Sequence, residues 1–309
     1  MESTRVERAP AKTRVSDGRV GSEKTMRIGI HVSIQGGMEA MARRAERLGC
    51  ETVQVFSRSP RGGKASALDS RDIEKMKEMF DRLGIWPLVV HVPYFLNLAS
   101  ADREKRLASI EILVEDLGRS EALGAKYLVT HLGHLSPGEE SESPQAIARV
   151  TDSIRSALDA YRGPVKILLE NTAGQGREIG WRFEVIGAML ENLPADRVGA
   201  CLDTCHAFAA GYDLSSARAV DATLKEFDRC IGLSRLGVIH MNDSKGDCGS
   251  HVDRHEHIGR GKIGADGFRA ILGSPLLPPD IPGILETPQD SAEDDERNVQ
   301  TLKSLRSQA

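Results

Sequence analysis

KYLVTHLG (126–133), QAIARVTDSIRSALDAY (145–161) and VKILLENT (165–172) together decide the fold of this chain. The first and third segments are short and rich in Val, Ile and Leu on both faces. This composition is typical of strands in a parallel sheet that helices cover. The middle segment is longer and has the period of an amphipathic helix. The sequence therefore predicts a strand, a helix and a second, parallel strand.

The same alternation extends from this unit toward both ends of the chain. Further strand candidates are RIGIHVS (27–33), TVQVFS (52–57), LVVHVPY (88–94), VGACLDTCH (198–206), LGVIHMND (236–243) and GILETP (283–288). Further helical stretches are Met38–Leu48, Asp72–Leu83, Arg103–Leu123, Phe183–Leu190 and Ala219–Ile231, and glycines at 49, 84, 124 and 163 stand where helices should end. Eight such repeats without a linker predict a single α/β domain, a (β/α)8 TIM barrel, over residues 26–309. A doubly wound sheet is the alternative.

Residues 1–25 are polar and contain no apolar stretch of the signal-peptide type, so we expect a flexible N-terminal extension. No apolar run of the chain approaches the roughly 18 residues that a membrane span requires. The five cysteines are scattered without a disulfide framework, which favours reduced, buried thiols and a cytoplasmic location. We expect a monomer with no membrane partner.

Histidines and acidic residues recur where the predicted strands end or in the loops just beyond. They are His91, His131, Glu170, Asp203, His206, His240, Asp253, His255 and Glu286. The carboxyl ends of the strands of a barrel open onto one mouth, where barrel enzymes carry their active sites. One such residue alone would more often be a hydrogen-bonding or salt-bridge partner in the core. Nine of them together predict a metal centre.

The ligand types indicate which metals and which chemistry to expect. Imidazole and carboxylate groups together suit zinc, and they are compatible with manganese at one position. Four carboxylates would repel one another without cations, whereas three divalent cations would leave a positive pocket that attracts a phosphate. The net charge of −4 argues against binding nucleic acid by bulk charge. Contact with DNA would therefore depend on this local positive centre.

Seven segments resemble the signature segments of the endonuclease IV family of abasic-site endonucleases. They are HVSIQGG (31–37), HVPYFLNLAS (91–100), ENTAGQG (170–176), LDTCHAFAAGYD (202–213), HMNDSK (240–245), VDRHEHIGRGKIG (252–264) and LETP (285–288). The resemblance implies a TIM barrel with three zinc ions that acts in base excision repair. Such an enzyme cuts double-stranded DNA 5′ to an abasic site, leaving a 3′-hydroxyl and a 5′-deoxyribose phosphate, with 3′-end trimming as a further reaction.

The resemblance also implies a role for each residue of the predicted metal centre. The implied ligands are His91 and His131 for the first zinc, Glu170 as a bridge to the second, Asp203, His240 and Glu286 for the second, and His206, Asp253 and His255 for the third. Glu170 and Glu286 would also be catalytic, because the attacking hydroxide is held near them. The abasic nucleotide would be flipped out of the duplex, which its missing stacking and pairing make easier.

Five residues are candidates for contact with DNA. Tyr94 matches the residue that fills the gap left in the duplex, and Arg61 matches an arginine with a similar wedge role. The candidates for phosphate contacts are Lys245, Arg254 and Lys262.

Two loops depart from the family pattern. The family usually has HPGSH where this chain has His131-Leu-Gly-His134, and after Arg61 this chain has Gly63 in a position where the family often has an aromatic residue.

The alternative interpretation is a sugar isomerase or epimerase of the same superfamily. It would need one metal, held by Glu170, Asp203, His240 and Glu286. The GxGxxG match at 259–264 follows a polar loop rather than a strand, so the context of a dinucleotide site is missing.

Overall fold

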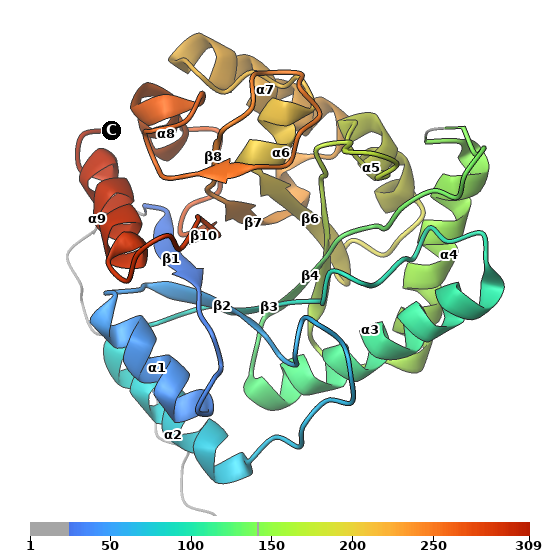
Figure 1. Ribbon diagram of the computed structural model, residues 1–309, viewed down its shortest axis with the longest axis horizontal. Helices are drawn as coiled ribbons and strands as arrows, with labels where there is room; N and C mark the ends of the chain where they lie inside the picture. Colours follow the sequence, from blue (N-terminus) through green and yellow to red (C-terminus); the bar gives the residue numbers. More distant parts are fainter. Residues whose placement is uncertain (1–24, 141) are drawn as a thin grey trace, which may run out of the picture.

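The computed structural model describes residues 25–140 and 142–309 (Figure 1). The predicted N-terminal extension therefore lies, apart from Thr25, outside the described residues. The strands of the barrel are β1 (Arg27–His31), β2 (Thr52–Phe56), β3 (Leu88–His91), β4 (Tyr127–Thr130), β5 (Lys166–Glu170), β6 (Val198–Asp203), β7 (Leu236–His240) and β10 (Pro282–Leu285). They pair in parallel and close in the order β1-β10-β7-β6-β5-β4-β3-β2. The predicted (β/α)8 barrel is confirmed.

Helices surround the barrel on its outer side (Figure 1). They are α1 (Met38–Arg47), α2 (Ser70–Leu83), α3 (Arg103–Leu123), α4 (Pro144–Ala160), α5 (Phe183–Glu191), α7 (Ala217–Cys230), α8 (Gly264–Leu272) and α9 (Asp294–Arg306), and the short α6 (Thr204–Ala209) follows β6 at the barrel mouth. Several begin at a polar residue whose side chain accepts a backbone N–H of the first turn, as Asp69, Asp102 and Ser143 do. None of the described helices is long and apolar enough to cross a membrane.

Several local expectations differ from the structure. The strand predicted to reach His206 ends at Asp203, because the Asp203 carboxylate accepts the N–H of His206 at 2.7 Å and starts α6. Helix α4 ends at Ala160 and is followed by extended backbone at Tyr161, so Gly163 does not cap it. Helices α8 and α9 were absent from the predicted helical stretches. The other predicted strands also end one to three residues before their predicted ends.

The apolar core of the protein forms two layers, one on each side of the barrel wall. The outer layer packs the helices against the strands, and the inner layer is formed by Val89, Val129, Leu168, Cys201, Val238 and Ile284. Burial raises the pKa of the Cys201 thiol to about 12, so this core residue is a protonated thiol. The expectation of buried thiols holds for three of the five cysteines, whereas Cys230 is partly exposed and Cys248 is exposed.

Candidate metal centre

The nine predicted metal-centre residues all lie at the mouth of the barrel. Four of them are the last residues of strands, namely His91, Glu170, Asp203 and His240. His131 and Glu286 each follow directly after a strand, and His206 lies in α6. Asp253 and His255 come from the loop after β7, where the two-residue strand β9 (His255–Glu256) pairs with β8 (Asp243–Ser244). Segments far apart in sequence therefore contribute to one connected cluster.

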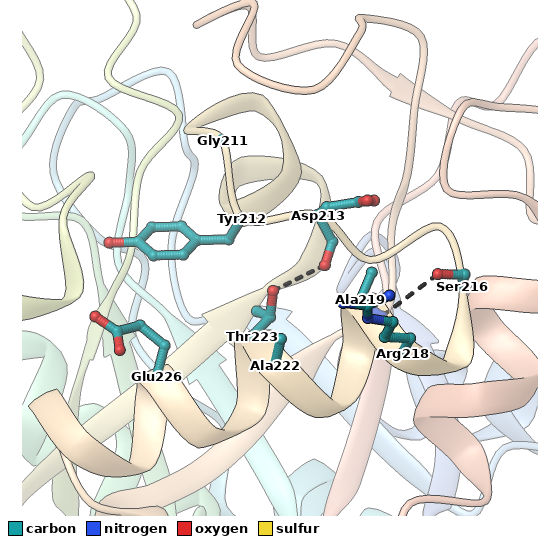
Figure 2. A pocket seen from close by; sticks show the side chains of 9 residues that line it. All are labelled: Gly211, Tyr212, Asp213, Ser216, Arg218, Ala219, Ala222, Thr223 and Glu226. Atoms are coloured by element: carbon teal, nitrogen blue, oxygen red, sulfur yellow. Dashed lines mark hydrogen bonds between the residues drawn. The ribbon is translucent and has the colours of Figure 1, made fainter.

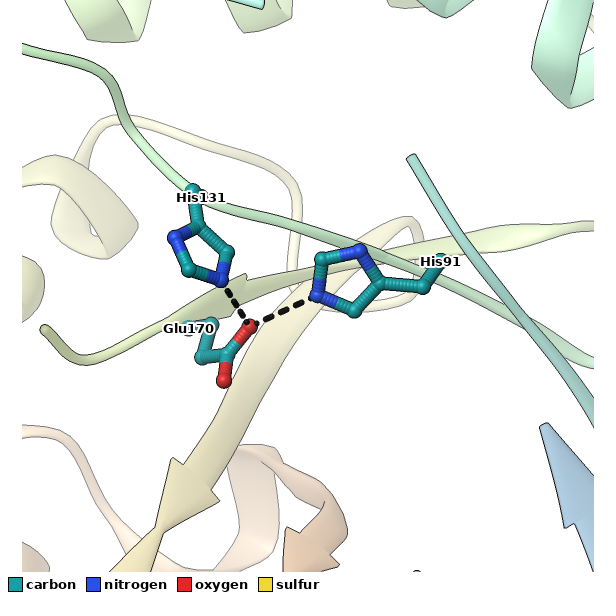
Figure 3. Close-up of side chains that lie close together, drawn as sticks. All are labelled: His91, His131 and Glu170. Carbon is teal, nitrogen blue, oxygen red and sulfur yellow. Dashed lines mark hydrogen bonds and ion pairs between the residues drawn. The ribbon is translucent and has the colours of Figure 1, made fainter. Parts of the chain in front are cut away.

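Glu170 is the centre of this cluster and is fully buried. Figure 3 shows His91 and His131 facing the same oxygen of Glu170. Its Oε2 lies 2.9 Å from Nε2 of His91 and 3.1 Å from Nε2 of His131, and its Oε1 lies 2.8 Å from Nδ1 of His240. Burial raises the pKa of Glu170, but the positive charge of His131 and His240 outweighs it and holds the pKa well below its usual range. Glu170 is thus an ionised carboxylate that three imidazoles share.

A second group of donor atoms lies around His240. Its Nδ1 is 3.4 Å from Oε2 of Glu286 and 3.7 Å from Oδ2 of Asp203. Asn242 fixes both acids, because its amide donates to Oδ2 of Asp203 at 2.7 Å and its Oδ1 accepts the backbone N–H of Glu286 at 2.7 Å. The two carboxylates therefore face the same imidazole nitrogen.

A third group lies around Asp253. Its Oδ1 is 3.3 Å from Nε2 of His206 and 3.4 Å from Nε2 of His255, and Nε2 of His255 is 3.9 Å from Oδ2 of Asp203. Burial raises the pKa of Asp253, but the hydrogen bond and charge of His206 outweigh it and lower the pKa to about 2. Asp253 is therefore a carboxylate between two imidazoles.

The hydrogen bonds behind the imidazoles suit metal ligation. Nδ1 of His91, His206 and His255 lies 2.6, 2.9 and 2.8 Å from the backbone oxygens of Val92, Asn171 and Glu286. A carbonyl oxygen only accepts, so each Nδ1 carries hydrogen and each Nε2 faces the carboxylates. This is the arrangement that metal-ligating histidines show in proteins, where the second nitrogen is fixed by an acceptor.

Two further observations test whether the residues fit metal ions. Nε2 of His255 is buried and has no hydrogen-bond partner among the described residues, although a buried polar atom is normally satisfied. Ligand atoms bound tetrahedrally at 2.0–2.1 Å lie about 3.3 Å apart. Several nitrogen–oxygen distances in the second and third groups, from 3.3 to 3.4 Å, match this spacing. The donor set fits zinc.

A cavity of about 230 Å³ opens at this cluster. Its lining residues are Tyr94, His131, His206, Asp253, His255 and Glu286. A larger hollow of about 460 Å³ lies elsewhere, over α7 and the loop before it, between Gly211 and Glu226 (Figure 2). It contains none of the nine residues, so the chemistry belongs to the smaller cavity.

Of the five candidate DNA contacts, only Tyr94 lines the cavity. Its side chain is exposed, and its ring lies 5.9 Å from that of His131. Arg61 is exposed in the loop between β2 and α2.

The three candidate phosphate contacts are exposed, and each already has a partner. Nζ of Lys262 is 3.1 Å from Asp247, Nζ of Lys245 is 3.9 Å from Glu256, and Arg254 donates to the backbone oxygen of Asp253. The structure places these three on the β8–β9 side of the mouth without showing a contact to DNA.

The structure explains two unusual segments of the sequence, the GxGxxG match at 259–264 and the loop after β4. The glycines of the GxGxxG match surround the buried Asp243 carboxylate, which accepts the N–H groups of Gly259 at 2.9 Å and Gly261 at 3.0 Å. A Cβ at Gly261 would collide with that carboxylate. The shortened loop after β4 is held by the Asn97 amide, which donates to the oxygen of His134 and accepts its N–H, both at 3.0 Å.

Three residues of the mouth were missed in the sequence. His31 ends β1 in the same way that His91 ends β3, which is a signal that could have found it. Gln54 is a polar residue within the apolar strand Thr52–Phe56, and it contacts His240 and Glu286. Phe95 is exposed beside Tyr94, where an apolar side chain next to a predicted DNA contact is itself a signal.

We expect the stability of the metal-free protein to fall at both ends of the pH range. Burial lowers the pKa of His131, but Glu170 outweighs it, so the pKa is raised above 6.5. A raised pKa stabilises the fold below pH 6.5, and this contribution is lost as the pH rises through the folded-state value. The lowered pKa of Asp253 stabilises the fold above pH 3.8, and this contribution is lost as the pH falls toward about 2.

The melting temperature of chelator-treated protein should therefore be highest between about pH 4 and 6.5 and several degrees lower at alkaline pH. Zinc-loaded protein should lose this alkaline decline, because metal ions take the place of the imidazole protons. Thermal denaturation followed by circular dichroism measures both. A flat profile from neutral to alkaline pH in the chelated protein would contradict the charge arrangement.

The fold and the site together define a barrel of a particular class. The family model described as "Xylose isomerase-like TIM barrel" matches residues 42–308. Within that class, the chain belongs to the endonuclease IV family. It is 43% identical over 281 residues to the "Probable endonuclease 4" of Methanosphaerula palustris, covering 91% of this chain and 98% of that one. It is 45% identical over 280 residues to the protein of the same name from Methanoculleus marisnigri, covering 90% and 98%.

Solved structures give the same placement. The crystal structure of endonuclease IV from Thermus thermophilus aligns with a TM-score of 0.81 and 35% identity, covering 92% of this chain and 100% of that one. A D-tagatose 3-epimerase-like protein aligns with a TM-score of 0.69 and 18% identity, covering 91% and 97%, which shows a shared fold alone.

Proposed function

We propose that this protein is a zinc-dependent endonuclease that cuts double-stranded DNA 5′ to abasic sites and leaves a 3′-hydroxyl and a 5′-deoxyribose phosphate. One observation carries the proposal: nine histidine and carboxylate side chains meet at the barrel mouth in a chain of the endonuclease IV family. The same chemistry would trim blocked 3′ ends. We further propose a monomer that acts in the cytoplasm, where it would reach DNA.

The three donor groups described above would hold three metal ions, in the assignment that the family resemblance implies. They are His91, His131 and Glu170; Glu170, Asp203, His240 and Glu286; and His206, Asp253 and His255 with Asp203 nearby. Bound divalent cations would supply Lewis acidity to the phosphodiester and neutralise the charge that develops on its oxygens. Zinc suits these ligands, and manganese at one position is compatible with them.

The protein's own groups have separate tasks in this reaction. Glu170 is fully buried and orients the imidazoles around it. Glu286 is 14% exposed at the cavity wall, and because Oε1 accepts a hydrogen bond from Gln54, Oε2 remains available to accept one from the attacking water. The apolar side chains inside the barrel lie below the mouth, and this low-dielectric surrounding strengthens the electrostatic contacts above it.

A duplex that carries one tetrahydrofuran abasic analogue tests the activity. Protein purified without chelator should nick the duplex immediately 5′ to the analogue and leave an undamaged duplex intact. Chelator should abolish the nick, and added zinc should restore it. Absence of a nick by fully metal-loaded protein would overturn the proposal.

We expect Tyr94→Ala to weaken binding of the abasic duplex by about tenfold or more, the scale of losing one aromatic–base contact. The side chain is exposed at the cavity and packs edge-on against the rings of Phe56 and His131, at ring-centroid distances of 5.3 and 5.9 Å. It supplies no atom to the three donor groups, so metal content should not change. Tyr94→Phe keeps the ring and should bind nearly as wild type. Fluorescence anisotropy measures binding and elemental analysis measures metal. Normal binding with lost metal would contradict the role.

Metal stoichiometry separates the proposal from the single-metal isomerase or epimerase interpretation. An isomerase would use Glu170, Asp203, His240 and Glu286 and leave the other five residues without a task. His206, Asp253 and His255 form a group of their own with metal-like spacing, which favours several ions. Elemental analysis should give about three zinc ions per chain. One ion per chain, with epimerase activity on a ketose, would support the alternative.

A further inference from the structure

The side chain of Gln54 is fully buried in the wall of the barrel. It lies in the middle of β2, between the buried residues Val53 and Val55. Burying an amide destabilises a fold unless its donors and acceptor are satisfied. The partners of this amide therefore indicate why it is there.

All partners of the Gln54 amide belong to the barrel mouth. Its Nε2 lies 2.6 Å from Oε1 of Glu286 and 3.1 Å from Nδ1 of His31. Its Oε1 lies 2.9 Å from Nε2 of His240. One amide thus joins the ends of β1, β7 and β10 from the side of β2.

The chemistry of these partners permits one orientation of the amide. A carboxylate oxygen only accepts hydrogen bonds, so the nitrogen of Gln54 must face Glu286. The amide oxygen then faces His240, and because that oxygen only accepts, Nε2 of His240 must carry hydrogen. The second hydrogen of the amide is donated to His31, whose Nδ1 accepts.

Two consequences follow for the proposed second metal site. With hydrogen on Nε2, His240 offers Nδ1 to the ligand cluster, and this atom lies 2.8, 3.7 and 3.4 Å from Glu170, Asp203 and Glu286. With Oε1 engaged by Gln54, Glu286 offers Oε2 to the same cluster. One ligand atom of each residue is selected by the same amide.

We infer that Gln54 is a positioning residue, which fixes the hydrogen of His240 on Nε2 and turns one oxygen of Glu286 toward the second metal site. The inference rests on the proposed metal-dependent function and deepens it. Groups that orient metal ligands from behind typically change metal affinity by 10–100-fold when they are removed. Gln54 would act in this way on two ligands at once.

Gln54→Met tests the inference, because methionine has a similar length and no strong hydrogen bond. We expect about 10–100-fold weaker binding of one zinc ion of the three, measured by competition with a chromophoric chelator. The rate constant for cleavage should fall while KM for the abasic duplex stays near wild type. The visible spectrum of the cobalt-substituted variant should change, because one metal site is distorted.

Two further variants separate positioning from general stability. Val55→Ala removes methyl groups from the next residue of β2, whose side chain points to the other face of the sheet. It should lower the melting temperature and leave zinc affinity unchanged. Gln54→Glu still accepts from His240 but repels Glu286, so its zinc affinity should lie between wild type and Gln54→Met. Wild-type zinc affinity in Gln54→Met would overturn the inference.

Nuclear magnetic resonance of wild-type protein with ¹⁵N-labelled histidine tests the inference without any substitution, so misfolding of a variant cannot affect the result. The signal of His240 should show a slowly exchanging hydrogen on Nε2, both with zinc and without it. A hydrogen on Nδ1 alone, or rapid exchange at Nε2, would overturn the inference. Because this measurement requires no cleavage, its failure is distinguishable from failure of the proposed nuclease activity.

Discussion

Glu170→Gln is expected to reduce cleavage of the abasic duplex by about a thousandfold or more, the upper scale for loss of one electrostatic contact in a preorganised site. The carboxylate contacts His91, His131 and His240 and is completely shielded from water. Glutamine has nearly the same shape but no charge, so it cannot serve two donor groups as a shared anionic ligand. Bound zinc should decrease as well, because both groups lose this ligand.

Single-turnover cleavage and elemental analysis of the same preparation measure the two effects of Glu170→Gln. Glu191→Gln is a matched control, because it makes the same chemical change at an exposed residue that ends α5, outside the ligand cluster. The control should keep its zinc and nearly all of its activity. Full zinc content with wild-type cleavage in Glu170→Gln would show that Glu170 does not have the proposed role.

Glu286→Gln is expected to lower the cleavage rate by about 100- to 1,000-fold while the fold and most of the zinc are retained. Glu286 differs from Glu170 in its surroundings, because it lines the cavity and remains 14% exposed. A glutamine that keeps the hydrogen bond from Gln54 through its oxygen would turn its NH2 group, which only donates, toward the second donor group. The variant would lose the anionic oxygen that faces the attacking water, and the loss should appear in kcat rather than in KM.

Circular dichroism, zinc analysis and steady-state kinetics of Glu286→Gln check this expectation. Glu293→Gln makes the same chemical change at an exposed residue just before α9 and should leave kcat unchanged. A wild-type turnover number in Glu286→Gln would rule out the proposed role, and so would a loss confined to KM.

Much of this protein follows from patterns within short segments. The alternation of apolar strands with amphipathic helices predicted the closed barrel, because both periods are local properties of the chain. A residue that follows a buried strand, such as His131 or Glu286, is placed at the mouth once the barrel is given. The start of α6 after Asp203 was not predicted, because it depends on one side chain. Asp203 caps the helix that carries His206.

The sequence by itself determined the barrel, the end of it that is polar and the nine side chains that gather there. Only the tertiary structure decided which nitrogen of each imidazole faces its neighbours, which donor atoms form separate groups, and that Gln54 and His31 join them. The reason is distance along the chain: Gln54 and Glu286 are 232 positions apart, yet one hydrogen bond of 2.6 Å connects them. No local period encodes such a contact, because closure of the barrel creates it.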